Sequence, residues 1–252
     1  MMNNAFLLTF LSVSGVSLLS LLGAVTLFFN KPFLKKVLIF MVSISAGAMF
    51  GDVFIHLLPE ISKKSEFNLS VSSAFIFGIL ISFIIERLVL WNNCHDHECT
   101  EKDKRAFTYM ILYGDSVHNF IDGIVIASSY LISPAVGLAS TLAVILHEIP
   151  HEIGDFAVLI HGGFTHRKAL IANFISALTA LLGALFAFFL AQYTRQFEVY
   201  LLAFAAANFI YIAGTDLIPE LHKELDRKRA VIQIIFFILG VLLMLPLLLL
   251  EK

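Results

Sequence analysis

Eight apolar stretches, each long enough to cross a bilayer as a helix, constrain this chain more than any other feature. A spanning helix needs about 20 mostly apolar residues for a hydrocarbon core of roughly 30 Å. Hydrophobic residues fill 59% of the 252 positions and charged residues only 14%, which excludes an ordinary water-soluble domain. We predict an all-α, polytopic membrane protein forming a single transporter domain over residues 1–252. Its spans are expected at about 5–29, 34–59, 69–91, 106–130, 134–160, 168–192, 197–219 and 230–250.

Basic residues are divided unequally between the two sets of loops. Thirteen of the 17 Lys and Arg residues lie in or beside the loops after spans one, three, five and seven, and the others are Lys63, Lys64, Arg195 and Lys252. Because short basic loops stay in the cytoplasm, the polar loop at about 92–105 is predicted to be cytoplasmic and both termini non-cytoplasmic. The cell membrane is the expected location. The formal charge of −2 offers no cationic face for nucleic acid.

The ends of spans two and seven share a short pattern. Residues 51–60 and residues 214–220 both have a Gly and an Asp near the start. Both end with two aliphatic residues followed by a Pro-Glu pair. Since one of these spans ends outside and the other inside, spans one to three and six to eight are predicted to be inverted repeats around spans four and five. The alternative is that a Pro-Glu pair merely ends an apolar helix at the water line.

Ionisable side chains crowd spans four and five, where each costs several kcal/mol and therefore marks a pathway or a site. His118 and Asp122 stand four residues apart, as do His147 and His151, so each pair lies on one helix face. Three imidazoles and one carboxylate suit a tetrahedral divalent ion such as Zn²⁺. A second, oxygen-rich position adjoining the first would combine Asn119, Asp122, Glu148 and His151.

The same residues allow an enzyme of a different class. Residues 147–151 satisfy the H-E-x-x-H pattern, in which two imidazoles hold zinc and the Glu activates a water, so an intramembrane metalloprotease of the site-2 type is the alternative function. Against it, His118 and Asp122 fill the position that a hydrolase keeps open, and site-2 enzymes take a third ligand, an Asp, from a later span. We therefore expect a transporter and no enzyme.

The two motifs, 118–123 and 147–157, resemble the paired signature of the ZIP (Zrt/Irt-like) divalent metal transporters, in the form found in their histidine-rich subgroup. The resemblance implies transport of Zn²⁺, and of other divalent cations such as iron, manganese or cadmium, into the cytoplasm. It implies a binuclear centre, with one metal held by His118, Asp122, His147 and His151 and the other by Asn119, Asp122, Glu148 and His151. It also implies homodimers and an elevator-like motion of spans one, four, five and six against spans two, three, seven and eight.

Further potential ligands lie outside the two motifs. The cytoplasmic loop carries Cys94, His95, His97 and Cys99, which either bind metal or form an ordinary solvated tract. Seven other residues could guide an ion: Asp52 and His56 on span two, His161 and His166 beside span five, and Asp216, Glu220 and His222 on span seven. Each of them could equally be an ordinary interfacial or loop residue.

Overall fold

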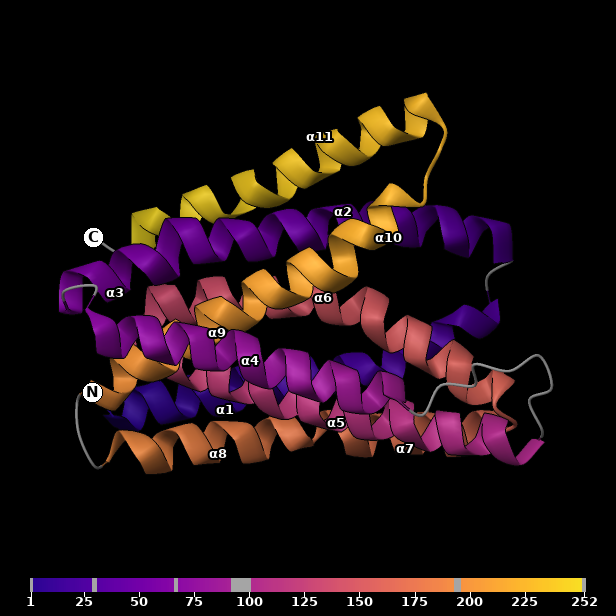
Figure 1. Ribbon diagram of the computed structural model, residues 1–252, viewed down its shortest axis with the longest axis horizontal. Coiled ribbons are helices and arrows are strands. Elements are labelled where there is room, and N and C mark those ends of the chain that lie inside the picture. The colour runs from indigo at the N-terminus through magenta and orange to yellow at the C-terminus, as the bar shows by residue number, and fades with distance from the viewer. Residues whose placement is uncertain (1, 29–30, 66–67, 92–100, 193–195, 251–252) are drawn as a thin grey trace.

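The computed structural model describes residues 2–28, 31–65, 68–91, 101–192 and 196–250, and over these ranges it contains helices and turns but no strand. Along the described residues, eight helical segments run up and down one long axis, with both chain ends at the same end of the bundle (Figure 1). The prediction of an all-α, polytopic membrane protein is confirmed.

The segments follow the order of the apolar stretches. The first half comprises α1 (Met2–Leu19) with η1 (Ser20–Phe28), α2 (Lys31–Asp52) with η2 (Val53–Leu57) and α3 (Leu58–Lys64), α4 (Leu69–Trp91), and α5 (Glu101–Ile132). The second half comprises α6 (Pro134–His161), α7 (His166–Ala177) with α8 (Thr179–Ala191), α9 (Gln196–Ile212) with η3 (Ala213–Leu217) and α10 (Ile218–His222), and α11 (Arg227–Met244) with η4 (Leu245–Leu250).

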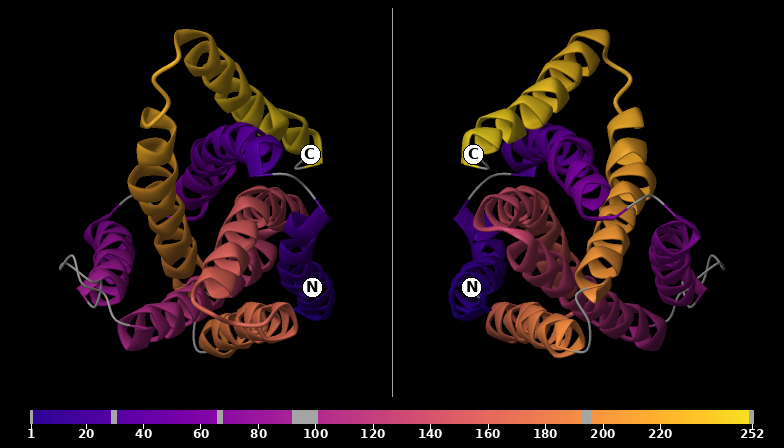
Figure 2. Two further views of the ribbon diagram at one scale, coloured as in Figure 1. Left: turned by 90° about the vertical axis from the view of Figure 1, so that its right-hand side faces the viewer. Right: turned by 90° about the vertical axis from the view of Figure 1, so that its left-hand side faces the viewer.

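Six of these segments are long and apolar enough to cross a membrane, judged on the described residues. They cover Asn4–Ala24, Val37–Lys64, Leu69–Arg87, His166–Ala191, Phe197–His222 and Arg227–Leu249. The two remaining segments, α5 and α6, are long enough but carry the ionisable residues of the two motifs. They lie among the apolar helices: α6 occupies the middle of the bundle in the end-on views (Figure 2), and residues 121–130 of α5 are all buried.

Two wide helical turns interrupt spans two and seven at corresponding places. In η2 and in η3 the residue after the turn donates its N–H to the carbonyl five residues earlier, and a proline follows directly, at Pro59 and Pro219. The two spans run in opposite directions, since Lys64 at the end of α3 pairs with Glu198 near the start of α9 at 3.7 Å. The sequence likeness between residues 51–60 and 214–220 therefore extends to the backbone.

Glycines allow the closest helix crossings. Where α5 meets α8, a Cβ on Gly123 would overlap the carbonyl oxygen of Ala180, and a Cβ on Gly183 would overlap that of Phe120. The crossing of α2 and α11 has the same arrangement around Gly47. In a bilayer, where lipid is as apolar as leucine, such small residues let backbones approach and gain van der Waals contact. The bundle thus holds two closely packed helix pairs, α5 with α8 and α2 with α11.

Candidate metal centre

The centre of the bundle is formed where α5 and α6 face each other. The two helices are joined by a single residue, Ser133, whose side chain accepts a hydrogen bond from the Val136 N–H and caps the start of α6. This tight connection makes α5 and α6 antiparallel neighbours, so the motif on each helix lies opposite the other.

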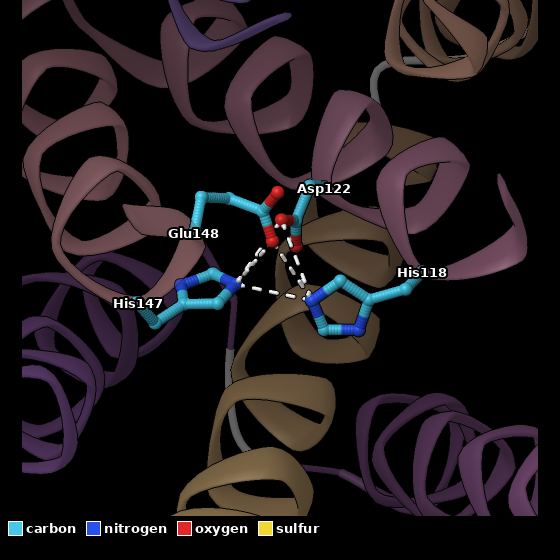
Figure 3. A group of neighbouring side chains, drawn as sticks. All are labelled: His118, Asp122, His147 and Glu148. Carbon is cyan, nitrogen blue, oxygen red and sulfur yellow. Dashed lines mark hydrogen bonds and ion pairs between the residues drawn. The ribbon is translucent and has the colours of Figure 1, made fainter. Parts of the chain in front are cut away.

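Four side chains converge between these helices, as Figure 3 shows: His118 and Asp122 from α5, and His147 and Glu148 from α6. The Nε2 atoms of the two imidazoles are 3.2 Å apart. Oε1 of Glu148 lies 3.2 Å from Nε2 of His118 and 3.4 Å from Nε2 of His147. Oδ2 of Asp122 lies 3.2 Å from Nε2 of His147 and 3.8 Å from Nε2 of His118. We call these four residues the four-donor cluster.

These separations match the edges of a tetrahedron around one zinc ion. Zinc binds nitrogen and oxygen at about 2.0–2.1 Å, and the edge of a tetrahedron is about 1.6 times the centre-to-corner distance, which gives donor separations of about 3.3–3.4 Å. Two carboxylates and two neutral imidazoles also balance the charge of a divalent cation. The cluster can therefore hold one Zn²⁺ with little rearrangement.

The imidazole of His147 is held in position by its own helix. Its Nδ1 donates a hydrogen bond to the carbonyl of Ala143 at 3.1 Å, which leaves Nε2 directed at the cluster. A metal-binding histidine is commonly oriented in this way through its second nitrogen. Phe209 of α9 contacts the ring edge-on, with centroids 6.1 Å apart, and closes the apolar side of the site.

Pro150 lies inside α6, next to the cluster, and cannot donate to the carbonyl of Leu146. That carbonyl instead accepts from the hydroxyl of Ser45 on α2. The sequence requires that the freed carbonyl find a partner in the bundle or in water, and a neighbouring helix supplies it. The α6 helix therefore continues across Pro150 and keeps His147 and His151 on one continuous segment.

In the described part of the chain, no lysine or arginine pairs with the carboxylates of the four-donor cluster. Among the described residues, their ion-pair neighbours are the imidazoles alone. Both oxygens of Asp122 and Oε1 of Glu148 are buried and make no hydrogen bond. Buried carboxylate oxygens without a hydrogen bond are costly, so the arrangement is suited to a bound cation.

A second group of donors lies one helical turn away, at Asp115, His151 and Asp155. Nδ1 of His151 is 3.8 Å from Oδ1 of Asp115 and 3.5 Å from Oδ2 of Asp155. The ring of His151 stacks on that of His118, with centroids 4.8 Å apart and planes 7° from parallel. We call Asp115, His151 and Asp155 the three-donor cluster. His118 thus contacts both clusters.

The six residues singled out in the sequence are divided between these clusters. His118, Asp122 and His147 come together as expected, but Glu148, and not His151, is the fourth member of their cluster. His151 faces Asp115 and Asp155 instead. Asn119 donates from Nδ2 to Oδ1 of Asp115 at 2.8 Å and stands beside the three-donor cluster.

Asp115 and Asp155 are the two donors that the sequence reasoning did not assign. The signal for Asp155 was present, since it stands four residues after His151, the spacing already used for His147 and His151. Asp115 stands three residues before His118, which also brings it to the same side of a helix.

The secondary candidates have different surroundings. Asp52 is buried and accepts from the Ser140 hydroxyl, and Nε2 of His56 donates to the Met244 carbonyl, so both face the bundle interior. Asp216 lines a cavity of about 220 Å³ together with Asp115, His118, His151 and Asp155. Exposed side chains are found at Glu220, His222 and His166. Cys94, His95, His97 and Cys99 lie outside the described residues, and of His161 the structure describes only its place at the end of α6.

Comparison with known proteins identifies relatives of this chain. The family described as "ZIP Zinc transporter" matches residues 91–248. Zinc transporter ZIP13 of Pongo abelii is 32% identical over an alignment of 223 residues that covers 81% of this chain and 65% of that protein. The Zinc transporter ZIP13 homolog of Drosophila melanogaster is 29% identical over an alignment, gaps included, of 279 positions that covers 86% of this chain and 79% of that protein. Human Zinc transporter ZIP4 is 43% identical over 124 residues, 49% of this chain and 19% of that protein.

Proposed function

The chain belongs to the ZIP zinc transporter family, and we propose from this premise that it carries Zn²⁺ across a membrane through the four-donor cluster between α5 and α6. Zinc transport is the activity that the family supports. The observation that carries the site is the separation of 3.2–3.8 Å between the Nε2 atoms of His118 and His147 and from each of them to the Asp122 and Glu148 oxygens, which suits one tetrahedral zinc ion. Asn119 and His151 serve a second ion beside it, so the centre is binuclear.

The family resemblance implies that transport is directed into the cytoplasm, and the orientation of the chain identifies the cytoplasmic end of the bundle. Both termini lie at one end of the bundle, and the end of α4, the start of α5 and the loops after α6 and α10 lie at the other (Figure 1). Most basic residues belong to that second end, which supports its cytoplasmic assignment by the positive-inside rule and gives non-cytoplasmic termini. The cell membrane is the proposed location, and uptake of external zinc by intact cells expressing the protein would test it.

An elevator-like motion between two groups of helices is proposed from the family resemblance, and helices of the two groups also pack on one another, as α2 does on α6. The glycine crossing joins α5 to α8, and α6 packs against α1 and η1, while α2 packs on α11 and α4 on α9. The first group contains the metal donors and the second contains none of the two clusters' residues, over the described part of the chain. A homodimer follows from the family resemblance, and the mass of the detergent-solubilised protein would test it.

The protease alternative receives no support from the relatives, which are named zinc transporters. It also conflicts with the geometry of H-E-x-x-H. In such an enzyme both imidazoles bind one zinc, whereas Nε2 of His147 faces Asp122 and Nδ1 of His151 faces Asp115 and Asp155.

Uptake of Zn²⁺ into liposomes containing the purified protein tests the proposal. His147→Ala removes a donor that is 1% exposed, and we expect it to lose most of the uptake. His222→Ala removes an exposed histidine from α10 and serves as the matched control, with uptake close to that of the wild type. Equal uptake by both variants would contradict a transport site at the four-donor cluster.

A further inference from the structure

A chain of buried polar side chains ties α6, which carries metal donors, to α2. The hydroxyl of Ser140 on α6 donates to Oδ2 of Asp52 on α2 at 2.8 Å. The hydroxyl of Ser129 on α5 donates in turn to that of Ser140 at 2.9 Å. We propose that these three residues form a gate contact, which holds the non-cytoplasmic side of the metal centre shut and breaks when that side opens. The proposal rests on the zinc transport proposed above and concerns its control.

Burial gives the gate contact its stabilising effect. Asp52, Ser129 and Ser140 are each 0% exposed. A polar group that is withdrawn from water is costly unless it is hydrogen-bonded. The bond from Ser140 to Asp52 exists only while α2 and α6 are packed together, so it opposes the separation of these two helices.

The gate contact and the open cavity lie on opposite sides of the four-donor cluster along α6. Ser140 precedes His147 by seven residues, which is about 10 Å along a helix axis. Asp155 follows His147 and lines the cavity of about 220 Å³, whose described lining includes neither Ser140 nor Asp52. Since the end of α6 adjoins a basic loop assigned to the cytoplasm, the gate contact lies on the non-cytoplasmic side.

The contact also joins helices of different groups. Both clusters draw donors from α5 and α6, and neither draws one from α2, over the described part of the chain. The short connection through Ser133 keeps α5 and α6 together, so Ser129 and Ser140 lie on the same side of the interface. A displacement of α5 and α6 along α2 therefore breaks the bond to Asp52 and leaves the bond between the two serines intact.

The two wide turns of spans two and seven differ in the way that a gate closed on one side requires. Asp52 directly precedes η2, and both Asp52 and His56 within that turn are 0% exposed. Asp216, within the corresponding turn η3, is exposed and lines the cavity. Spans two and seven run in opposite directions, and alternating access exposes the two sides of such an arrangement in turn. The structure thus has its open side at η3 and its closed side at η2.

Accessibility of a thiol placed between the gate contact and the metal tests the proposal. Val144 is 0% exposed and lies one helical turn from Ser140 and one turn from Glu148, on the same face of α6. The parent protein is the full-length chain with Cys94 and Cys99 replaced by serine and with Val144→Cys as the reporter. Its labelling by a water-soluble maleimide is followed in zinc-free detergent solution. Adding Ser140→Ala should speed the labelling about three- to tenfold, because the open population grows by the contribution of one hydrogen bond.

Two controls separate opening of the gate from general loosening. Ser128→Ala removes a hydroxyl that is equally buried but donates to the Val125 carbonyl of its own helix, so labelling should stay at the parent rate. Val13→Cys on α1 provides a second reporter in place of Val144→Cys, and this thiol, also at a position that is 0% exposed, should stay protected when Ser140→Ala is added.

Two results would overturn the gate contact. One is labelling of Val144→Cys that Ser140→Ala leaves at the parent rate, and the other is faster labelling of both reporters, which means that Ser140 only stabilises the fold. Zinc is absent from this assay, whereas the transport site is refuted by normal Zn²⁺ uptake of His147→Ala. Failure of the gate contact and failure of the transport site are therefore distinguishable.

Discussion

The geometry of the four-donor cluster predicts that Glu148 is a zinc ligand. Oε1 of Glu148 lies 3.2 and 3.4 Å from the two imidazole nitrogens, and the side chain is 1% exposed. With Asp122 it balances the two charges of Zn²⁺, so Glu148→Gln leaves one positive charge without compensation in a buried site. Removing one partner of a buried ion pair costs about 3–5 kcal/mol. At about 1.4 kcal/mol per factor of ten, the Kd for Zn²⁺ should rise roughly 100- to 5,000-fold.

The Kd is measured by titrating the purified protein with Zn²⁺ in competition with a chelator of known affinity. Glu152→Gln provides the matched control, since Glu152 is on the same helix and equally buried at 1% exposed, but hydrogen-bonds to Asn173 and not to the imidazoles. The Kd of its tighter zinc site should stay within about tenfold of the wild-type value. A loss of about tenfold is the lower end of the range caused by changing a residue that only supports a metal ligand. If Glu148→Gln also stayed within that range, the assignment of Glu148 as a zinc ligand would be wrong.

Three further predictions concern packing and selectivity. Gly123→Ala should lower stability by about 1–3 kcal/mol, because the new Cβ overlaps a carbonyl of α8; the melting temperature in detergent should fall, whereas Gly15→Ala, where a Cβ meets nothing, should not lower it. Ser45→Ala leaves the Leu146 carbonyl without its hydroxyl donor and should cost about 1–3 kcal/mol by the same assay, a loss that would be absent if water replaced the hydroxyl. Cd²⁺ should inhibit Zn²⁺ uptake into liposomes and Mg²⁺ in large excess should not, because Mg²⁺ prefers oxygen ligands to imidazole; inhibition by Mg²⁺ would contradict the two-imidazole site.

The topology could be predicted because a bilayer imposes one length on every span. Apolar runs of about 20 residues fixed the number and order of the helical segments, and the structure lengthens several of them by a few residues, as in α5, which covers Glu101–Ile132 where 106–130 was expected. The break between α7 and α8 was not foreseen. It occurs at Leu178, next to Thr179, whose hydroxyl donates to the Ser116 carbonyl on α5, a contact between helices that no local pattern reveals.

The membership of the metal centre could be predicted more readily than its division into two clusters. Spacing by four places two residues on one helix face, and this brought His118 and Asp122 together with His147. It does not determine side-chain torsions, and these decide that Glu148 reaches the four-donor cluster while His151 turns towards Asp115. Helix periodicity therefore defines a set of candidate donors, and the side-chain directions assign each donor to an ion.

The central position of α5 and α6 follows from the cost of their carboxylates. These helices carry Asp115, Asp122, Glu148, Glu152 and Asp155 in or beside the two clusters. A charged side chain near the middle of a bilayer costs about 2.5–3.5 kcal/mol, so five facing lipid would cost on the order of 12–17 kcal/mol. A protein is typically stable by only about 5–15 kcal/mol, and such an arrangement would not persist. The six apolar segments must therefore surround the two polar ones. The carboxylates and imidazoles that make α5 and α6 too polar to be recognised as spans by hydropathy are the same side chains that can bind a cation.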